Sequence, residues 1–149
     1  MKYIGKKGLD LIKRYEGFMP NAYLCPAGKW SIGYGHTNGV NKDTKPIDKE
    51  EAEMLLKEDL MTITNDLNRI LPESLTQNQF DSLCSFCYNL GFGAFMSSTL
   101  RKVIERNPHD YEPIRKEFMR WVHVNKVKMN GLVKRREAEA DLYCNEKEN

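Results

Sequence analysis

The chain has 149 residues, 40% of them hydrophobic and 30% charged, and its formal net charge is +2. These values are typical of a single globular domain, and so small a net charge gives no support to nucleic acid as a partner. The chain has no apolar run of about 18 residues and no secretory signal at its start, so we expect no membrane span and accumulation in a cytoplasm.

The first predicted helix covers residues 3–15, where apolar side chains recur at helical spacing. Gly17 is expected to end it, because glycine readily adopts the backbone that closes a helix. Glu16 would then stand at the last turn. A carboxyl group partly buried there could keep its proton and act as a general acid, whereas a fully solvated one could not. Both interpretations of Glu16 remain open from its residue type and position.

Residues 21–37 are predicted to form two strands joined by the turn Pro26-Ala27-Gly28. A loop this short brings Cys25 and Ser31 onto neighbouring strands, close to direct pairing. We therefore expect Cys25 and Ser31 to share one cleft with Glu16. From its residue type, Cys25 could hold a water, act as a nucleophile or simply pack.

The second of these strands alternates between bulky and small residues. One face, expected to be packed, carries Trp30, Ile32, Tyr34 and His36. The other face, expected to be nearly bare, carries Ser31, Gly33, Gly35 and Thr37. A bare face indicates that another chain, such as a ligand, lies against it, or that it packs closely on a helix. A histidine on the packed face is expected to make a structural hydrogen bond or ion pair, and no metal site is expected.

A long helix is predicted over residues 48–71, opened by a cap at Asp48 and ended by Pro72. It would join a sheet lobe at about 15–50 to a helical lobe at about 72–145, which also includes the N-terminal helix. Further helices are expected around Phe80–Tyr88, after a capping box at Thr76–Gln79, and around Leu100–Arg106, with Ser98 or Thr99 as its cap. Two more are expected around Tyr111–Val122 and Leu132–Cys144. The predicted fold is α+β, mostly α, in one domain over residues 1–149.

Four cysteines are expected to be free thiols in a reducing compartment. Cys84 and Cys87 are spaced as C-x-x-C, but they lie within a helical pattern and have no second pair of metal ligands. We predict core packing for both, with a redox or zinc role as the alternative.

The C-terminal region is basic, with Arg135 and Arg136 adjacent in the sequence and Lys126, Lys128 and Lys134 nearby. One interpretation is a solvated helix face. The other is that one of the two arginines reaches Glu16 or the substrate.

The spacing around Glu16 resembles that of the phage-type lysozymes of glycoside hydrolase family 24, the endolysins of tailed phages. Their signature is Glu, eight residues, Asp or Cys, five residues, Thr; here it is Glu16, Cys25 and Ser31. The flanking segments G-L-D-L-I-K-R-Y-E-G-F and W-S-I-G-Y-G-H-T are similar to that family nearly residue for residue. A weaker similarity to the same family is found in two later segments, N-L-G-F-G-A-F-M-S-S-T-L and G-L-V-K-R-R-E-A-E-A-D-L-Y. The resemblance spans about Gly8 to Tyr143.

The resemblance implies a lysozyme-like fold and hydrolysis of the β-1,4 bond between N-acetylmuramic acid and N-acetylglucosamine in bacterial peptidoglycan. Glu16 would be the proton donor, and Cys25 and Ser31 would position the attacking water. The glycan groove would be lined by Thr37, Tyr88, Asn89 and Ser98. Ser31 keeps the hydroxyl of the usual Thr but loses the methyl that restricts its rotamer. A neutral thiol at position 25 leaves open whether that residue is a base, a nucleophile or a positioner of water, and whether the reaction inverts or retains configuration.

The resemblance further implies a monomer without metal or cofactor. Such an enzyme would wait in the host cytoplasm and reach the periplasm and cell wall through a holin lesion. Two other functions are weighed against it. One is a lytic transglycosylase, which uses an acid but no water; the other is a non-catalytic module that binds glycan or nucleic acid through the basic residues.

Overall fold

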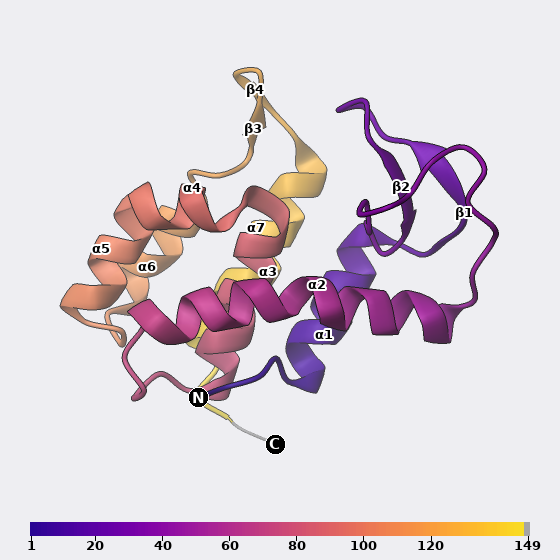
Figure 1. Cartoon of the computed structure of the whole chain (residues 1–149). Helices are drawn as coiled ribbons and strands as arrows, with labels where there is room; N and C mark the ends of the chain where they lie inside the picture. The colour runs from indigo at the N-terminus through magenta and orange to yellow at the C-terminus, as the bar shows by residue number, and fades with distance from the viewer. Residues whose placement is uncertain (148–149) are drawn as a thin grey trace.

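The computed structural model describes residues 1–147. Within them, seven helices and four short strands form two lobes (Figure 1). Strands β1 (Met19–Leu24) and β2 (Trp30–Gly33) form a small antiparallel sheet at one end. The helices that follow α2 in the chain gather at the opposite end, and α2 (Lys49–Ile70) itself runs between the two. The predicted α+β arrangement, with a long helix joining a sheet lobe to a helical lobe, is confirmed.

Helix α1 (Lys6–Glu16) ends at Gly17, as predicted. Gly17 has φ +74°, and its N–H donates to the carbonyl of Lys13 at 2.9 Å. A positive φ is costly for residues with a Cβ, so glycine is the residue that can close the helix here. Glu16 is consequently the last helical residue, and the chain turns toward the sheet lobe directly after it.

The β1–β2 hairpin has the predicted turn. Tyr23 pairs with Ser31 and Leu24 with Trp30, and the Cys25 N–H donates to the Lys29 carbonyl at 2.9 Å. Cys25 is two residues from the partner of Ser31, so the two side chains share one side of the hairpin.

The prediction that strand alternation continues to residue 37 is wrong. β2 ends at Gly33, where φ is +66°, and Gly35 has φ +91°. Ile32 and His36 then exchange two backbone hydrogen bonds of 2.9 Å across a tight turn. These glycines therefore make a turn, and residues 33–37 do not present two strand faces.

The long helix α2 begins as predicted, since Asp48 accepts a hydrogen bond from the Glu51 N–H at 2.8 Å. Its 22 residues span about 33 Å at ~1.5 Å per residue. The buried stripe consists of Ala52, Leu56, Leu60, Thr64 and Leu67. Its first part packs in the cluster beneath the sheet lobe and its last part in the helical core, so one helix serves both lobes.

Helix α3 (Gln77–Leu90) lies at the centre of the helical lobe and starts with the predicted capping box between Thr76 and Gln79. Phe86 makes edge-to-face contacts with Phe95, Phe118 and Trp121, at centroid distances of 6.1, 5.8 and 5.6 Å. The helices that complete this lobe are α4 (Phe92–Ser97), α5 (Thr99–Arg106), α6 (Tyr111–Phe118) and α7 (Asn130–Cys144). Cys84 and Cys87 are buried in the same core, as predicted, and all four cysteines are free.

The prediction of a helix through Val122 is also wrong, because α6 ends at Phe118. Strands β3 (His123–Val124) and β4 (Val127–Lys128) follow and pair as a second hairpin. Figure 1 shows this hairpin rising across from the β1–β2 lobe. In the sequence, Trp121 and Val122 continue the apolar spacing of a helix, but in the structure they pack at the base of this hairpin.

In the part of the chain that the structure describes, no helix combines the length and the apolar character needed to cross a membrane.

Candidate active site

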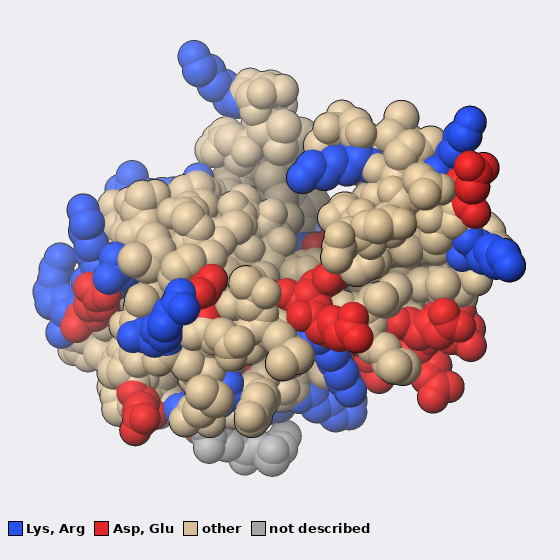
Figure 2. Space-filling view, in the orientation of Figure 1, with Lys and Arg blue, Asp and Glu red and all other residues tan. Residues whose placement is uncertain are grey.

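A cleft of about 350 Å³ lies between the lobes, and Figure 2 shows this face hollowed there. Four parts of the chain meet at it: the end of α1, the turn after β2, the middle of α2 and the end of α3. Its lining consists of Glu16, Gly35, Thr37, Asn38, Asp59, Ile63, Tyr88 and Asn89. Glu16 and three of the four residues predicted to line a groove are therefore brought to one place.

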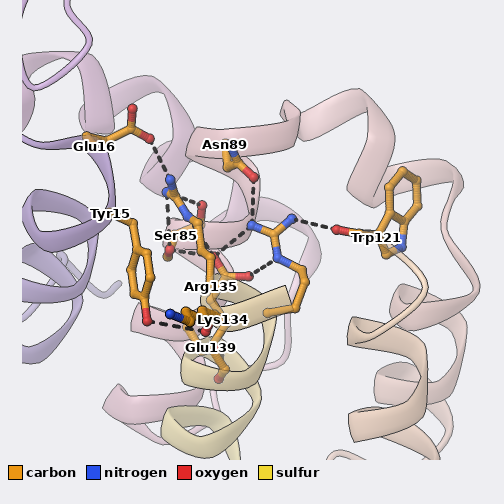
Figure 3. Close-up of polar contacts among 10 residues, drawn as sticks. Tyr15, Glu16, Ser85, Asn89, Trp121, Lys134, Arg135 and Glu139 are labelled. Atoms are coloured by element: carbon orange, nitrogen blue, oxygen red, sulfur yellow. Dashed lines mark hydrogen bonds and ion pairs between the residues drawn. The ribbon is translucent and has the colours of Figure 1, made fainter. Parts of the chain in front are cut away.

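Glu16 makes an ion pair at the floor of this cleft. Its Oε2 lies 2.6 Å from Nη1 of Arg135 on α7 (Figure 3). The Arg135 side chain is only 5% exposed, whereas that of Glu16 is 21% exposed. One carboxylate oxygen is thus held by a buried cation while the side chain as a whole still reaches solvent. The interpretation that an arginine reaches Glu16 is confirmed, and the solvated-face interpretation is wrong for Arg135 and Arg136, which are both buried.

Gly35 leaves room for the other oxygen of the acid. A Cβ built on Gly35 would lie 3.2 Å from Oε1 of Glu16 and 3.3 Å from the hydroxyl of Tyr88. Gly33 is small for a different reason, because a Cβ there would lie 3.0 Å from the Cβ of Ala52 on α2. Of the two explanations for the bare residues, helix packing therefore applies to Gly33, and an open cleft applies to Gly35.

Tyr88 connects the two sides of the cleft, since its hydroxyl donates to the carbonyl of Tyr34 at 2.7 Å. Burial, together with the neighbouring charges of Glu16 and Asp59, raises the pKa of Tyr88 well above its usual value. The phenol is therefore neutral at physiological pH and remains a hydrogen-bond donor.

Cys25 and Ser31 lie together on the β1–β2 hairpin, but the residues that line the cleft with Glu16 include neither of them. Hydrogen bonds to Cys25, first from the Lys29 backbone and then from groups that include the Ser31 side chain, lower the pKa of the Cys25 thiol. Ser31 is 3% exposed, and its hydroxyl lies 3.5 Å from the Lys29 carbonyl. The thiol is thus the more accessible and the more acidic member of the pair.

Ser98 lies elsewhere, although it was predicted to line the groove with Thr37, Tyr88 and Asn89. It is 4% exposed; its hydroxyl donates to the Phe95 carbonyl at 2.6 Å and accepts from the Arg101 N–H at 3.1 Å. These bonds cap α5, a role that the sequence also predicted for residue 98 or 99.

Asp59 is a cleft residue that the sequence did not reveal. It lies on α2 among several other acidic residues, and nothing in the helical pattern distinguishes it from them. The structure pairs it with His36, whose Nδ1 is 2.8 Å from Asp59 Oδ2, so the predicted structural role of this histidine is confirmed. Among the described residues, no group of three or more His, Cys, Asp or Glu side chains could hold a metal ion.

Comparison with known proteins places this cleft in a familiar class. A family model described as phage lysozyme matches residues 13–139. The chain is 45% identical to an endolysin of Acyrthosiphon pisum secondary endosymbiont phage 1, over 95% of this chain and 97% of that one. The muramidase domain of SpmX from Asticaccaulis excentricus superposes with a TM-score of 0.87 at 34% identity, over 97% and 99% of the two chains. A P22 lysozyme mutant gives a TM-score of 0.83 at 32% identity, over 97% and 100%.

Fold and cleft together define a lysozyme. The chain belongs to the phage lysozyme family. The predictions of a lysozyme-like fold and of a peptidoglycan-hydrolysing enzyme of the muramidase class are confirmed.

Proposed function

We propose that Glu16 is the general acid of an endolysin that cleaves the β-1,4 bond between N-acetylmuramic acid and N-acetylglucosamine. The observation that carries this proposal is the position of Glu16 in the interlobe cleft, with Oε2 paired to Arg135 and Oε1 beside Gly35. Breaking a glycosidic bond requires a proton on the leaving oxygen, and a carboxyl group facing the glycan can supply it.

Arg135 has a defined part in this step. As Glu16 gives up its proton, the carboxyl group becomes an anion, and the guanidinium 2.6 Å away stabilises that charge. Because Arg135 is buried and fixed in place before the reaction, no reorganisation is needed when the charge appears.

The attacking water is proposed to be positioned by Cys25 and Ser31 on the β1–β2 hairpin. A thiol with a lowered pKa and a neighbouring hydroxyl offer both hydrogen-bond donors and acceptors to a water. The glycan would lie along Thr37, Tyr88 and Asn89, which share the cleft with Glu16.

The acid is tested by Glu16→Gln, with Glu58→Gln as the matched control because Glu58 is an exposed glutamate on α2. We expect the first change to reduce the release of reducing ends from purified peptidoglycan by about 10²–10⁴-fold, the usual contribution of a general acid, and the second to leave it unaltered. A folded Glu16→Gln protein that lyses permeabilised Gram-negative cells at the unmodified rate would refute the assignment.

The products distinguish hydrolysis from transglycosylation. Hydrolysis gives muropeptides with a reducing muramic acid end, whereas a lytic transglycosylase gives an anhydro end, which is lighter by one water. Mass spectrometry of digested peptidoglycan is expected to find the reducing end. A non-catalytic binding module would give neither product.

The enzyme must also reach the cell wall from the compartment in which it is made. The phage endolysin relative supports a role in host lysis. In this proposal a monomer accumulates in the host cytoplasm and reaches the wall through a holin lesion. Expression of the chain alone is expected to leave cells intact until a membrane-permeabilising agent is added. Lysis without that agent would contradict the holin route, and sedimentation equilibrium tests the monomer.

A further inference from the structure

A completely buried carboxylate lies behind the cleft. Glu139 on α7 has a side-chain exposure of 0% and lies between the two arginines one turn earlier on the same helix (Figure 3). Its Oε2 is 3.3 Å from Arg135 Nε and 3.2 Å from Arg136 Nη2, and its Oε1 is 2.7 Å from Arg136 Nε. The Ser85 hydroxyl on α3 donates to Oε2 at 2.5 Å.

The contacts of Glu139 are those of an ionised group. Burial raises the pKa of this carboxyl, and the two guanidiniums oppose that effect. Its close polar neighbours are three N–H groups, which can only donate, and the Ser85 hydroxyl, which donates to it. An ionised carboxylate accepts from all four, whereas a protonated carboxyl would lose at least one of these contacts. A charge this deep is tolerated only where it is paired and hydrogen-bonded.

The two arginines then lead outward to different residues of the cleft. Arg135 contacts Oε2 of Glu16, and Arg136 Nη2 donates to the side-chain oxygen of Asn89 at 2.7 Å. One buried carboxylate therefore underlies both the proposed acid and a cleft-lining amide.

We infer that Glu139 is a positioning residue, a buried counter-charge that fixes Arg135 against Glu16 and Arg136 against Asn89 and limits how strongly Arg135 favours the Glu16 anion. The inference rests on the proposed function and extends it. A guanidinium next to a lone carboxylate stabilises the charged form, yet a general acid must carry its proton before it reacts. Because Arg135 is shared between Glu16 and Glu139, it can support the anion after proton transfer without keeping Glu16 ionised beforehand.

The remaining groups that face Glu16 come from other parts of the fold. Asp59 on α2, paired with His36, and the Tyr88 phenol on α3 line the same cleft. None of these groups contacts Glu139, so a shift of the pH profile on substituting Glu139 can be assigned to Arg135, which contacts both glutamates.

Glu139→Gln tests this most directly, since the amide keeps the shape and removes the charge. Arg135 is then balanced by Glu16 alone, which favours the Glu16 anion. We expect the alkaline limb of the kcat/KM profile to move to lower pH by about one unit, with a loss of activity of about tenfold at pH values above the limb. An unmoved limb in a folded variant would overturn the inference, because a purely structural role lowers stability without altering the profile.

Two further variants strengthen the test. Glu117→Gln is the matched control, because Glu117 is also a buried glutamate paired with an arginine, Arg120, but contacts no cleft residue. We expect it to cost stability with no movement of the limb. Arg136→Gln removes the other cation from Glu139 and should move the limb in the opposite direction, to higher pH. Movement of the limb in the same direction by Arg136→Gln and Glu139→Gln would contradict the proposed charge sharing.

Carbon NMR of the glutamate carboxyl groups makes the inference independent of activity. In the wild-type protein the Glu139 signal is expected to be that of a carboxylate at neutral pH, and in Glu139→Gln the Glu16 signal is expected to change at lower pH than in the wild type. If the variant does not fold, the wild-type titration decides, and a Glu139 that is neutral while Glu16 titrates overturns the inference. An unreactive wild-type protein with the expected titrations would instead refute the proposed function alone.

Discussion

The Tyr88 hydroxyl on α3 donates to the Tyr34 carbonyl 2.7 Å away, in the turn that follows β2. This bond joins the helical lobe to the turn that carries Gly35, the residue beside Glu16. The spacing between the two walls of the cleft is therefore set by a contact that lies within the cleft itself.

Tyr88→Phe is expected to lower the free energy of unfolding by about 1 kcal/mol, the usual net contribution of one hydrogen bond. It should also reduce kcat by more than that figure implies, because the turn beside Glu16 loses its attachment to α3. Urea unfolding and peptidoglycan hydrolysis measure the two effects. Tyr111→Phe is the control, since it removes a hydrogen bond to Glu146 on the far side of the helical lobe. An equal loss of activity in both variants would contradict this prediction.

Gly35→Ala and Gly39→Ala separate backbone strain from crowding of the acid. Both glycines have positive φ, +91° and +73°, so each substitution is expected to cost about 1–2 kcal/mol of stability. A Cβ at position 39 meets nothing within 4 Å, whereas one at position 35 meets Glu16 and Tyr88. We expect only Gly35→Ala to abolish hydrolysis of peptidoglycan; retained activity would show that the acid can be displaced without harm.

The thiols are expected to differ sharply in reactivity. Hydrogen bonding with the Lys29 backbone lowers the pKa of Cys25, whereas burial raises that of Cys84 and of Cys87. At any pH below the ordinary thiol pKa, Cys25 therefore has the larger thiolate fraction and should react first with a soluble disulfide reagent. Cys84 and Cys87 are expected to react only after unfolding. Peptide mapping of the labelled protein tests this order.

Cys25→Ser tests the role of the same thiol in catalysis. If Cys25 positions water, serine keeps a donor and an acceptor, and we expect a reduction in kcat of less than about tenfold. A complete loss of hydrolysis with intact folding would instead indicate that the thiolate itself takes part in the reaction.

Arg135→Gln is expected to destabilise the protein by about 3 kcal/mol, because it leaves the buried carboxylate of Glu139 with one cation fewer. Arg115→Gln is the control, since Arg115 forms an exposed pair with Asp141 and its loss should cost less than about 1 kcal/mol. Urea denaturation measures both. Comparable losses in the two variants would mean that the buried network contributes little to stability.

The elements with local signals were predicted well from the sequence. Gly17 ends α1, Asp48 starts α2, and Thr76 with Gln79 starts α3, because capping depends on residues within one turn of each other. The resemblance to phage lysozymes located Glu16, Tyr88 and Asn89, which meet in the cleft.

The elements governed by tertiary packing were harder to predict. Residues 33–37 alternate like a strand, but positive φ at Gly33 and Gly35 turns the chain there. Helix α7 carries so many charges that it resembles a solvated helix, and only the folded chain shows that Arg136 and Glu139 are buried. The one local signal for Glu139 was its spacing of three and four residues from the two arginines, a pair geometry that exposed helices also use.

The pairing of Glu16 with Arg135 joins positions 119 apart in the chain. Translation makes Glu16 before Arg135, so a nascent chain without α7 lacks this ion pair. Under the role proposed for Glu16, only chains in which α7 has docked hold the acid in its paired position.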